Sequence, residues 1–153
     1  MFIIEGNPGA DNAKMRKAGF EKAAKEGGLK VLVSRTAHWE TEEANTLVTN
    51  LLTSHPDVQG IMAANDSMAL GVVKALDAAG RSGKVQVVGF DNIPESAMSD
   101  PSLTTVDQFI QQMGFRAVEL LLSLLAGKPP EHMHLTLPTE LVMRQSTAPP
   151  SAP

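Results

Sequence analysis

Short apolar runs alternate with helical patterns along the first hundred residues of the chain. Each run is apolar throughout rather than alternating with polar residues, as expected of a strand buried on both faces of a parallel sheet. A spacing of about 30 residues between runs is typical of βαβ units, whose crossovers are right-handed. The pattern predicts an α/β fold with an open, doubly wound parallel sheet. The four runs are Phe2–Glu5, Lys30–Ser34, Gly60–Ala64 and Val85–Phe90.

The segments between these runs carry helical periodicity and end at helix-stopping residues. Gly27-Gly28 follows the first predicted helix, and Gly80 follows the third. Asp66 precedes the third helix and is the expected N-cap residue. The predicted helices are Ala10–Glu26, Glu42–Ser54, Ser67–Ala79 and Gln108–Ala126.

The remaining segments are less regular. Residues Asp91–Ser102 include two prolines and predict a long irregular connection, followed by a fifth short strand at Leu103–Val106. Polar and apolar residues alternate over His132–Met143, which favours a final edge strand or an extended segment. Residues 148–153 contain three prolines and are expected to form a disordered tail.

Composition excludes several classes of function. The chain of 153 residues has a formal net charge of -4 and no Cys, which excludes disulfides and thiol chemistry. Its longest apolar stretch, Ala117–Ala126, is interrupted by Glu119 and Ser123 and is shorter than the roughly 20 residues of a membrane span. Lys and Arg form no cluster, so we expect no contact with nucleic acid. The N-terminal segment opens directly as a core strand, so we expect the chain to begin within a fold.

The sequence contains none of the common phosphate-binding, metalloprotease or hydrolase motifs. Neither a GxGxxG nor a GK[ST] phosphate loop is present, and HExxH and GxSxG are absent. His132 and His134 are two residues apart, and no third ligand accompanies them, so no metal site is expected. We therefore expect a protein that is not an enzyme and that uses no cofactor.

Polar and aromatic side chains follow the predicted strands, at the edge where ligands bind in open parallel sheets. Amides, carboxylates and guanidinium groups match pairs of hydroxyls, and an indole offers an apolar face to a sugar ring. The set predicts a binding site for a neutral polyhydroxyl ligand. Four of the candidates also have a structural alternative: a turn residue for Asn65 and Asp91, a packing residue for Trp39, and a solvated or ion-paired side chain for Arg16. The candidates are Arg16, Trp39, Asn65, Asp91 and Gln108.

Several motifs together resemble the type I periplasmic sugar-binding proteins, in particular those that are ribose-binding-like. The residues that carry the resemblance are Arg16–Phe20, Asn65–Gly71, Val85–Pro94 and Thr104–Gln108. The effector domains of LacI-type repressors share this fold and are similar too. Residues 138–147 are closer to the repressor branch, whereas Glu5–Ala10 is closer to the transporter branch, so the motifs leave both open.

The resemblance implies a periplasmic-binding-protein-like lobe with flavodoxin-like layers, and it implies that the four polar candidates bind sugar hydroxyls beside Trp39. Family members have two lobes joined by three crossings. Residues 1–104 are then the C-terminal lobe, 105–130 a hinge strand and a helix of the missing N-terminal lobe, and 131–147 a return segment. Half of the cleft would be absent, and the helix Gln108–Ala126 is expected to self-associate or to dock onto its own lobe.

The resemblance implies a ribose- or galactose-type solute-binding component of a sugar ABC transporter. Such a protein is periplasmic or extracytoplasmic, binds a pentose or hexose, and is recognised by a membrane permease. The alternative is the sugar-effector lobe of a cytoplasmic LacI-type transcription regulator. A third interpretation, a phosphoacceptor like the response regulators, fits the βα rhythm but lacks the clustered acidic residues and Lys of such a site.

Overall fold

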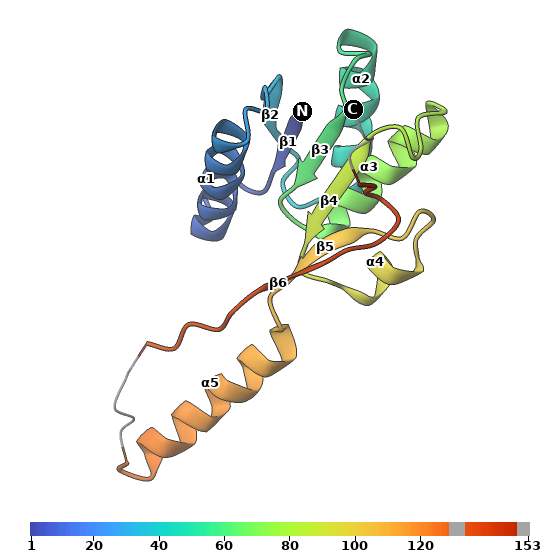
Figure 1. Cartoon of the computed structure of the whole chain (residues 1–153). Coiled ribbons are helices and arrows are strands. Elements are labelled where there is room, and N and C mark those ends of the chain that lie inside the picture. Colours follow the sequence, from blue (N-terminus) through green and yellow to red (C-terminus); the bar gives the residue numbers. More distant parts are fainter. Residues whose placement is uncertain (129–133, 150–153) are drawn as a thin grey trace.

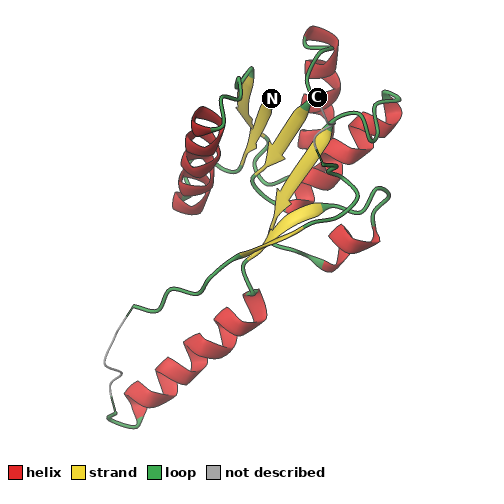
Figure 2. Ribbon diagram, in the orientation of Figure 1, coloured by secondary structure: helices red, strands yellow, loops and turns green. Residues whose placement is uncertain are grey.

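The computed structural model describes residues 1–128 and 134–149. These residues contain a six-stranded sheet with the strand order β2-β1-β3-β4-β5-β6. The first five strands are parallel and β6 runs antiparallel to β5. The mixed α/β architecture confirms the predicted fold class (Figure 1, Figure 2). The strands are β1 Phe2–Glu5, β2 Val33–Thr36, β3 Gly60–Ala63, β4 Gln86–Phe90, β5 Thr104–Asp107 and β6 Glu140–Val142. The helices are α1 Asp11–Glu26, α2 Thr41–Ser54, α3 Asp66–Ala78, α4 Pro94–Met98 and α5 Ile110–Leu125.

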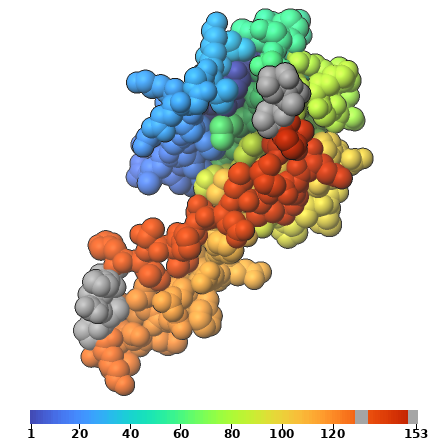
Figure 3. Space-filling view, viewed as in Figure 1, coloured from blue at the N-terminus to red at the C-terminus, as the bar shows by residue number. Residues whose placement is uncertain are grey.

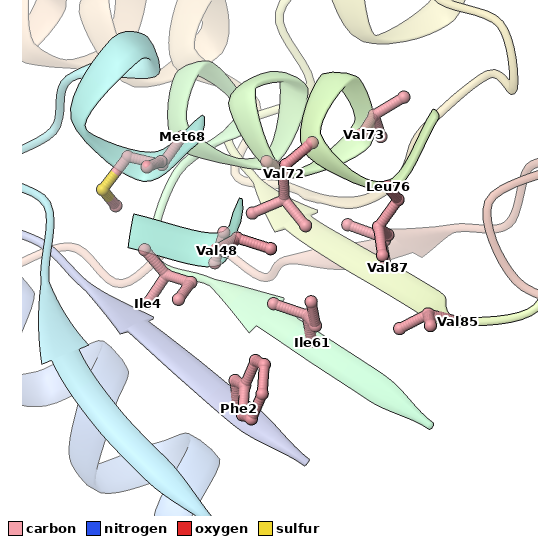
Figure 4. Packing of buried hydrophobic residues seen from close by; sticks show 14 of the residues in the cluster. Phe2, Ile4, Val48, Ile61, Met68, Val72, Val73, Leu76, Val85 and Val87 are labelled. Atoms are coloured by element: carbon pink, nitrogen blue, oxygen red, sulfur yellow. The ribbon is translucent and has the colours of Figure 1, made fainter. Parts of the chain in front are cut away.

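One face of the sheet packs against α2 and α3. Phe2 and Ile61 of neighbouring strands point toward these helices, as does Val87 of β4 (Figure 4). Val72 of α3 and Val48 of α2 meet them and are fully buried. Helix α1 lies beside β1 and β2, away from α2 and α3, and buries Phe20 and Ala24 (Figure 1). Burial of apolar surface between these layers stabilises the sheet whose strand ends carry the candidate residues.

Three local predictions were wrong. Strand β2 begins at Val33 rather than Lys30, because its pairing with β1 aligns Phe2 with Val33. The N-cap of α3 is Asn65 rather than Asp66, because the Asn65 side chain accepts a hydrogen bond from the Met68 N–H, 2.9 Å away. The connection after β4 also contains a short helix, α4, with Pro94 in its first turn.

Residues after α5 return to the sheet and complete it. Strand β6 pairs with β5, and the Ser146 hydroxyl then accepts from the Thr104 N–H at 2.8 Å and donates to the Val87 carbonyl at 2.7 Å. The predicted final strand is confirmed at residues 140–142. His132, which was considered as a metal ligand, and residues 150–153 of the predicted tail lie outside the described residues.

Helix α5 projects away from the sheet together with the first part of the return segment (Figure 1, Figure 3). It contains no buried residue, although most of its side chains are apolar. Among the described residues, no helix is both long and apolar enough to cross a membrane.

Candidate functional site

Arg16 of α1 is the centre of the polar cluster at the carboxyl ends of the strands. Its Nη2 lies 3.0 Å from Asp91 Oδ1, and its Nη1 donates to the Ala64 carbonyl at 2.6 Å. The guanidinium carbon lies 4.1 Å from the centre of the Phe90 ring and 5.6 Å from that of Trp39. Both contacts are within cation–π range. The guanidinium is thus fixed between two aromatic rings, a carbonyl and a carboxylate.

Asp91 receives a second contact from Gln108, whose Nε2 donates to Asp91 Oδ1 at 2.6 Å. The backbone of Asp91 has a φ of 114°, a conformation that is rare outside glycine. Burial raises the pKa of the Asp91 carboxyl above its ordinary value, and the adjacent Arg16 and Gln108 oppose this shift. The structure therefore brings Arg16, Asp91 and Gln108 together, as the sequence predicts.

Trp39 lies at the same edge, immediately after β2. Its backbone is left-handed, with a φ of 72°, and its half-buried ring packs beside the hydrophobic core and Gly6. The Thr36 hydroxyl donates to the Gly6 carbonyl at 2.7 Å, which holds the ends of β1 and β2 together. Trp39 thus packs against the core, as its structural alternative predicted, and its ring also lies beside Arg16.

Asn65 is at the sheet edge but makes a different contact. Its side-chain oxygen caps α3 by accepting from the Met68 N–H, so this oxygen is already occupied. The structure shows no hydrogen bond between Asn65 and the other four candidates. Asn65 thus has the N-cap role that the sequence assigned to Asp66, rather than the turn role considered for it.

Asp66, next to Asn65, is a buried carboxylate beneath the cluster. Its Oδ1 accepts from the Thr105 hydroxyl at 2.6 Å and its Oδ2 from the Ile93 N–H at 3.0 Å. A Cβ atom on Gly89 would overlap Oδ1, so the glycine makes room for this carboxylate. Burial raises the pKa of Asp66, with the hydrogen bonds from Thr105 and Ile93 opposing the shift. Asp66 therefore anchors the β4–α4 loop rather than facing a ligand.

Sequence reasoning missed several residues of this region. Phe90 was assigned only to a strand, although its position beside Asp91 at the strand end was a usable signal. Asn92 and Arg144 form a hydrogen-bond chain next to Asp91, with Arg144 Nη2 donating to Asn92 Oδ1 at 2.6 Å. Arg144 follows Asn92 by 52 residues, and nothing in its local sequence indicates this contact.

Planar hydrogen-bonding groups beside aromatic rings are suited to binding a polar ring compound with hydroxyl groups. Within the described ranges, no group of three or more His, Cys, Asp or Glu side chains is placed to hold a metal ion. The cluster lies at the carboxyl ends of parallel strands, the edge at which ligands bind in open sheets.

Comparison with known proteins assigns the family. The chain belongs to the periplasmic binding protein-like domain family, which it matches over residues 1–147. It is 42% identical to the D-ribose/D-allose-binding protein of Pseudomonas aeruginosa, an alignment that covers 92% of the chain and 46% of that protein. It is 36% identical to the ribose operon repressor of Halalkalibacterium halodurans, covering 94% of the chain and 44% of the repressor. The chain spans less than half the length of either relative.

The solved structures that resemble the chain are of the same two kinds, solute-binding proteins and repressors. A dimeric Lac repressor with an 11-residue C-terminal deletion superimposes with a TM-score of 0.91 at 28% identity, covering 98% of the chain and 56% of the repressor. An ABC transporter periplasmic solute-binding protein from Actinobacillus succinogenes with bound D-allose gives a TM-score of 0.86 at 38% identity, covering 95% and 52%. The relatives are sugar-binding transport proteins and transcription repressors rather than enzymes.

Proposed function

We propose that this chain forms one wall of a monosaccharide-binding site. The observation that carries the proposal is the cluster in which Arg16, Asp91 and Gln108 are hydrogen-bonded or ion-paired beside the rings of Trp39 and Phe90. Such a cluster holds its donors and acceptors in fixed directions before a ligand arrives, which lowers the entropic cost of binding.

Each side chain has a distinct part in this proposal. The carboxylate of Asp91 accepts hydrogen bonds from sugar hydroxyls, and Arg16 and Gln108 hold it in place while donating their remaining N–H groups. Trp39 offers its indole face to the C–H side of the sugar ring. Asn65 contributes its side-chain amide N–H groups, because its oxygen caps α3.

The complete protein in this proposal is a ribose- or galactose-type solute-binding component of an ABC importer, periplasmic or extracytoplasmic, that delivers a pentose or hexose to a membrane permease. The identity to a D-ribose/D-allose-binding protein and the similarity to a solute-binding protein holding D-allose support it. Residues 1–104 are proposed as the C-terminal lobe, and a second lobe would supply the opposite wall of the cleft. The chain alone then binds sugar weakly.

A second candidate is the sugar-effector lobe of a cytoplasmic LacI-type transcription regulator. The TM-score of 0.91 to a Lac repressor and the identity of 36% to a ribose operon repressor favour it. Both candidates require the same sugar-binding wall. The coding sequence preceding Met1 distinguishes them, because a signal peptide supports the transporter and a helix-turn-helix headpiece supports the regulator.

The sugar-binding proposal is tested by the fluorescence of Trp39, the one Trp in a chain that has no Tyr. Titration with D-ribose and D-allose should give a saturable change with a dissociation constant of about a millimolar, or about -4 kcal/mol. Asp91→Asn should weaken the response about tenfold or more, whereas Asp57→Asn, in the loop before β3 at the opposite end of the sheet, should not. A response that is absent, or is equal in both variants, would contradict the site. Sub-micromolar affinity would contradict the half-cleft.

A further inference from the structure

Arg144 connects the return segment to the loop that carries Asp91. Its Nη2 donates to Asn92 Oδ1 at 2.6 Å, and its Nη1 donates to the Leu103 carbonyl at 2.7 Å and to Ser96 Oγ at 3.1 Å. Its own backbone N–H donates to Thr104 Oγ1 at 2.8 Å. The contacts with Leu103 and Ser96 therefore hold the planar guanidinium in the position from which it bonds to Asn92.

Asn92 directly follows Asp91 and shares its unusual backbone conformation. Both residues have positive φ angles, 114° for Asp91 and 55° for Asn92, and such conformations persist only where the surroundings hold them. The Asp91 N–H donates to the Val106 carbonyl at 2.9 Å, and the Asn92 N–H donates to Thr105 Oγ1 at 3.3 Å. These contacts fix the backbone, while the Asn92 side chain is held by Arg144.

Asp107 extends the same chain of hydrogen bonds to α5. Its Oδ2 accepts from Asn92 Nδ2 at 2.9 Å, and its Oδ1 accepts from the Phe109 N–H at 2.6 Å. Phe109 has a left-handed φ of 52° and is the residue from which α5 begins. One carboxylate thus joins the Asn92 side chain to the turn that sets the direction of α5.

We propose that Arg144 is a positioning residue of the binding site, which holds Asp91 in its binding orientation through Asn92. The segment that enters α5, at Asp107, and the segment that returns from it, at Arg144, are then both connected to the carboxylate that faces the ligand. A change in the direction of α5 would alter how Asp91 is presented, and ligand bound at Asp91 would favour one direction of α5. This inference rests on the proposed function for the role of Asp91, but the hydrogen-bond chain can be tested without sugar.

The test compares Arg144→Met with Ser146→Ala by NMR of the folded chain. Ser146 anchors the same return segment to Thr104 and Val87 but does not contact Asn92. The readout is the side-chain amide signal of Gln108, whose Nε2 is bonded to Asp91. We expect this signal to shift, and its exchange with water to rise several-fold, in Arg144→Met only. Arg144→Lys, which lacks the planar fork, should not restore it.

Unchanged Gln108 signals in Arg144→Met would overturn the inference, as would equal changes in Ser146→Ala, since these would indicate general loosening of the segment. If Arg144→Met fails to fold, Arg144→Asn takes its place in the test, because it keeps a polar side chain at the position. Its Gln108 amide signal is interpreted in the same way. A sugar titration of the same variants separates the two proposals. Absence of any sugar response in the unmodified chain contradicts the proposed function, whereas a wild-type response in Arg144→Met contradicts only the positioning role.

Discussion

The indole of Trp39 lies directly against Gly6, so close that a Cβ atom on Gly6 would overlap the ring carbons of Trp39. Gly6 directly follows β1 and Trp39 comes shortly after β2, so this contact is made just beyond the ends of the two neighbouring strands. Any side chain at position 6 would move the indole, and with it the aromatic surface beside Arg16. The absence of a side chain at Gly6 thus determines where the Trp ring lies.

Gly6→Ala should therefore displace Trp39. We expect its fluorescence emission to shift to longer wavelength, because the displaced indole is more exposed to water. We also expect the free energy of unfolding to fall by about 1–3 kcal/mol, the usual cost of overpacking. Gly9→Ala in the same loop is the control, since its Cβ would meet Asn7 Oδ1 at an ordinary 3.4 Å. Unchanged emission and stability in Gly6→Ala would contradict the packing described here.

The ion pair between Arg16 and Asp91 should show strong energetic coupling. Their side chains are 13% and 19% exposed, so Arg16→Met leaves a mostly buried carboxylate without its cation and should cost about 3–5 kcal/mol. In a double-mutant cycle with Asp91→Asn, measured by urea unfolding, we expect a coupling of about 1–3 kcal/mol. The exposed pair Arg116–Glu119 is the reference and should give below about 0.5 kcal/mol. Equal coupling in the two pairs would count against a preorganised site.

The buried carboxyl of Asp66 predicts a pH dependence of stability. Its raised pKa means that the folded chain binds this proton more tightly than the unfolded chain. Tighter proton binding by the folded chain contributes to its stability. This stabilisation is fully present below the ordinary Asp pKa of about 3.9 and is lost as pH rises through the pKa of Asp66 in the folded chain. Asp66→Asn removes the titration, and it should cost about 1–3 kcal/mol at low pH because an NH2 group replaces one of the two oxygens that accept from Ile93 and Thr105.

The measurement is urea unfolding of both chains from about pH 4 to pH 7, spanning the ordinary Asp pKa and neutrality. The difference in unfolding free energy between the two chains cancels the contributions of the titrating groups that they share. We expect the stability advantage of the unmodified chain over Asp66→Asn to shrink as pH rises. A difference that is constant or grows with pH would show that burial does not dominate the titration of Asp66.

Apolar runs were sufficient to predict the sheet, because strands covered on both faces consist almost entirely of apolar residues. The apolar runs did not predict the first residue of β2 correctly. Lys30–Leu32 is as apolar as the strand itself, and only pairing with β1 selects Val33 as its first residue. The cap of α3 was similarly ambiguous, because adjacent Asn65 and Asp66 are both good N-cap residues and the buried contacts of Asp66 decide between them.

The site was predictable where its residues directly follow a strand. Asp91 and Gln108 are examples, because topology alone brings strand ends together. Arg144 was not predictable, since its contact with Asn92 depends on the path of the return segment after α5. Position along the chain therefore identifies the residues at the strand ends better than it identifies their more distant hydrogen-bond partners.

Helix α5 carries two apolar rows. Met113, Ala117 and Leu120 line a groove of about 390 Å³ shared with residues of the return segment. The opposite row contains Leu122 and Leu125, which are 59% and 76% exposed. Arg116 and Glu119 are the charged residues of this helix and pair with each other, so little repulsion opposes the approach of a second copy. Burying a Leu side chain contributes about 1.5–3 kcal/mol, enough for a few such contacts to favour association.

We predict that the chain self-associates through α5, pairing this helix with α5 of a second copy about a two-fold axis. Light scattering after size exclusion should show a mass that rises with concentration toward a dimer. Leu122→Glu should shift the chain to monomer, whereas Leu29→Glu should not, although Leu29 is also 59% exposed and lies after α1. Circular dichroism of both variants confirms that helix content is kept. A strict monomer at every concentration, or the same loss of dimer in Leu29→Glu, would refute association through α5.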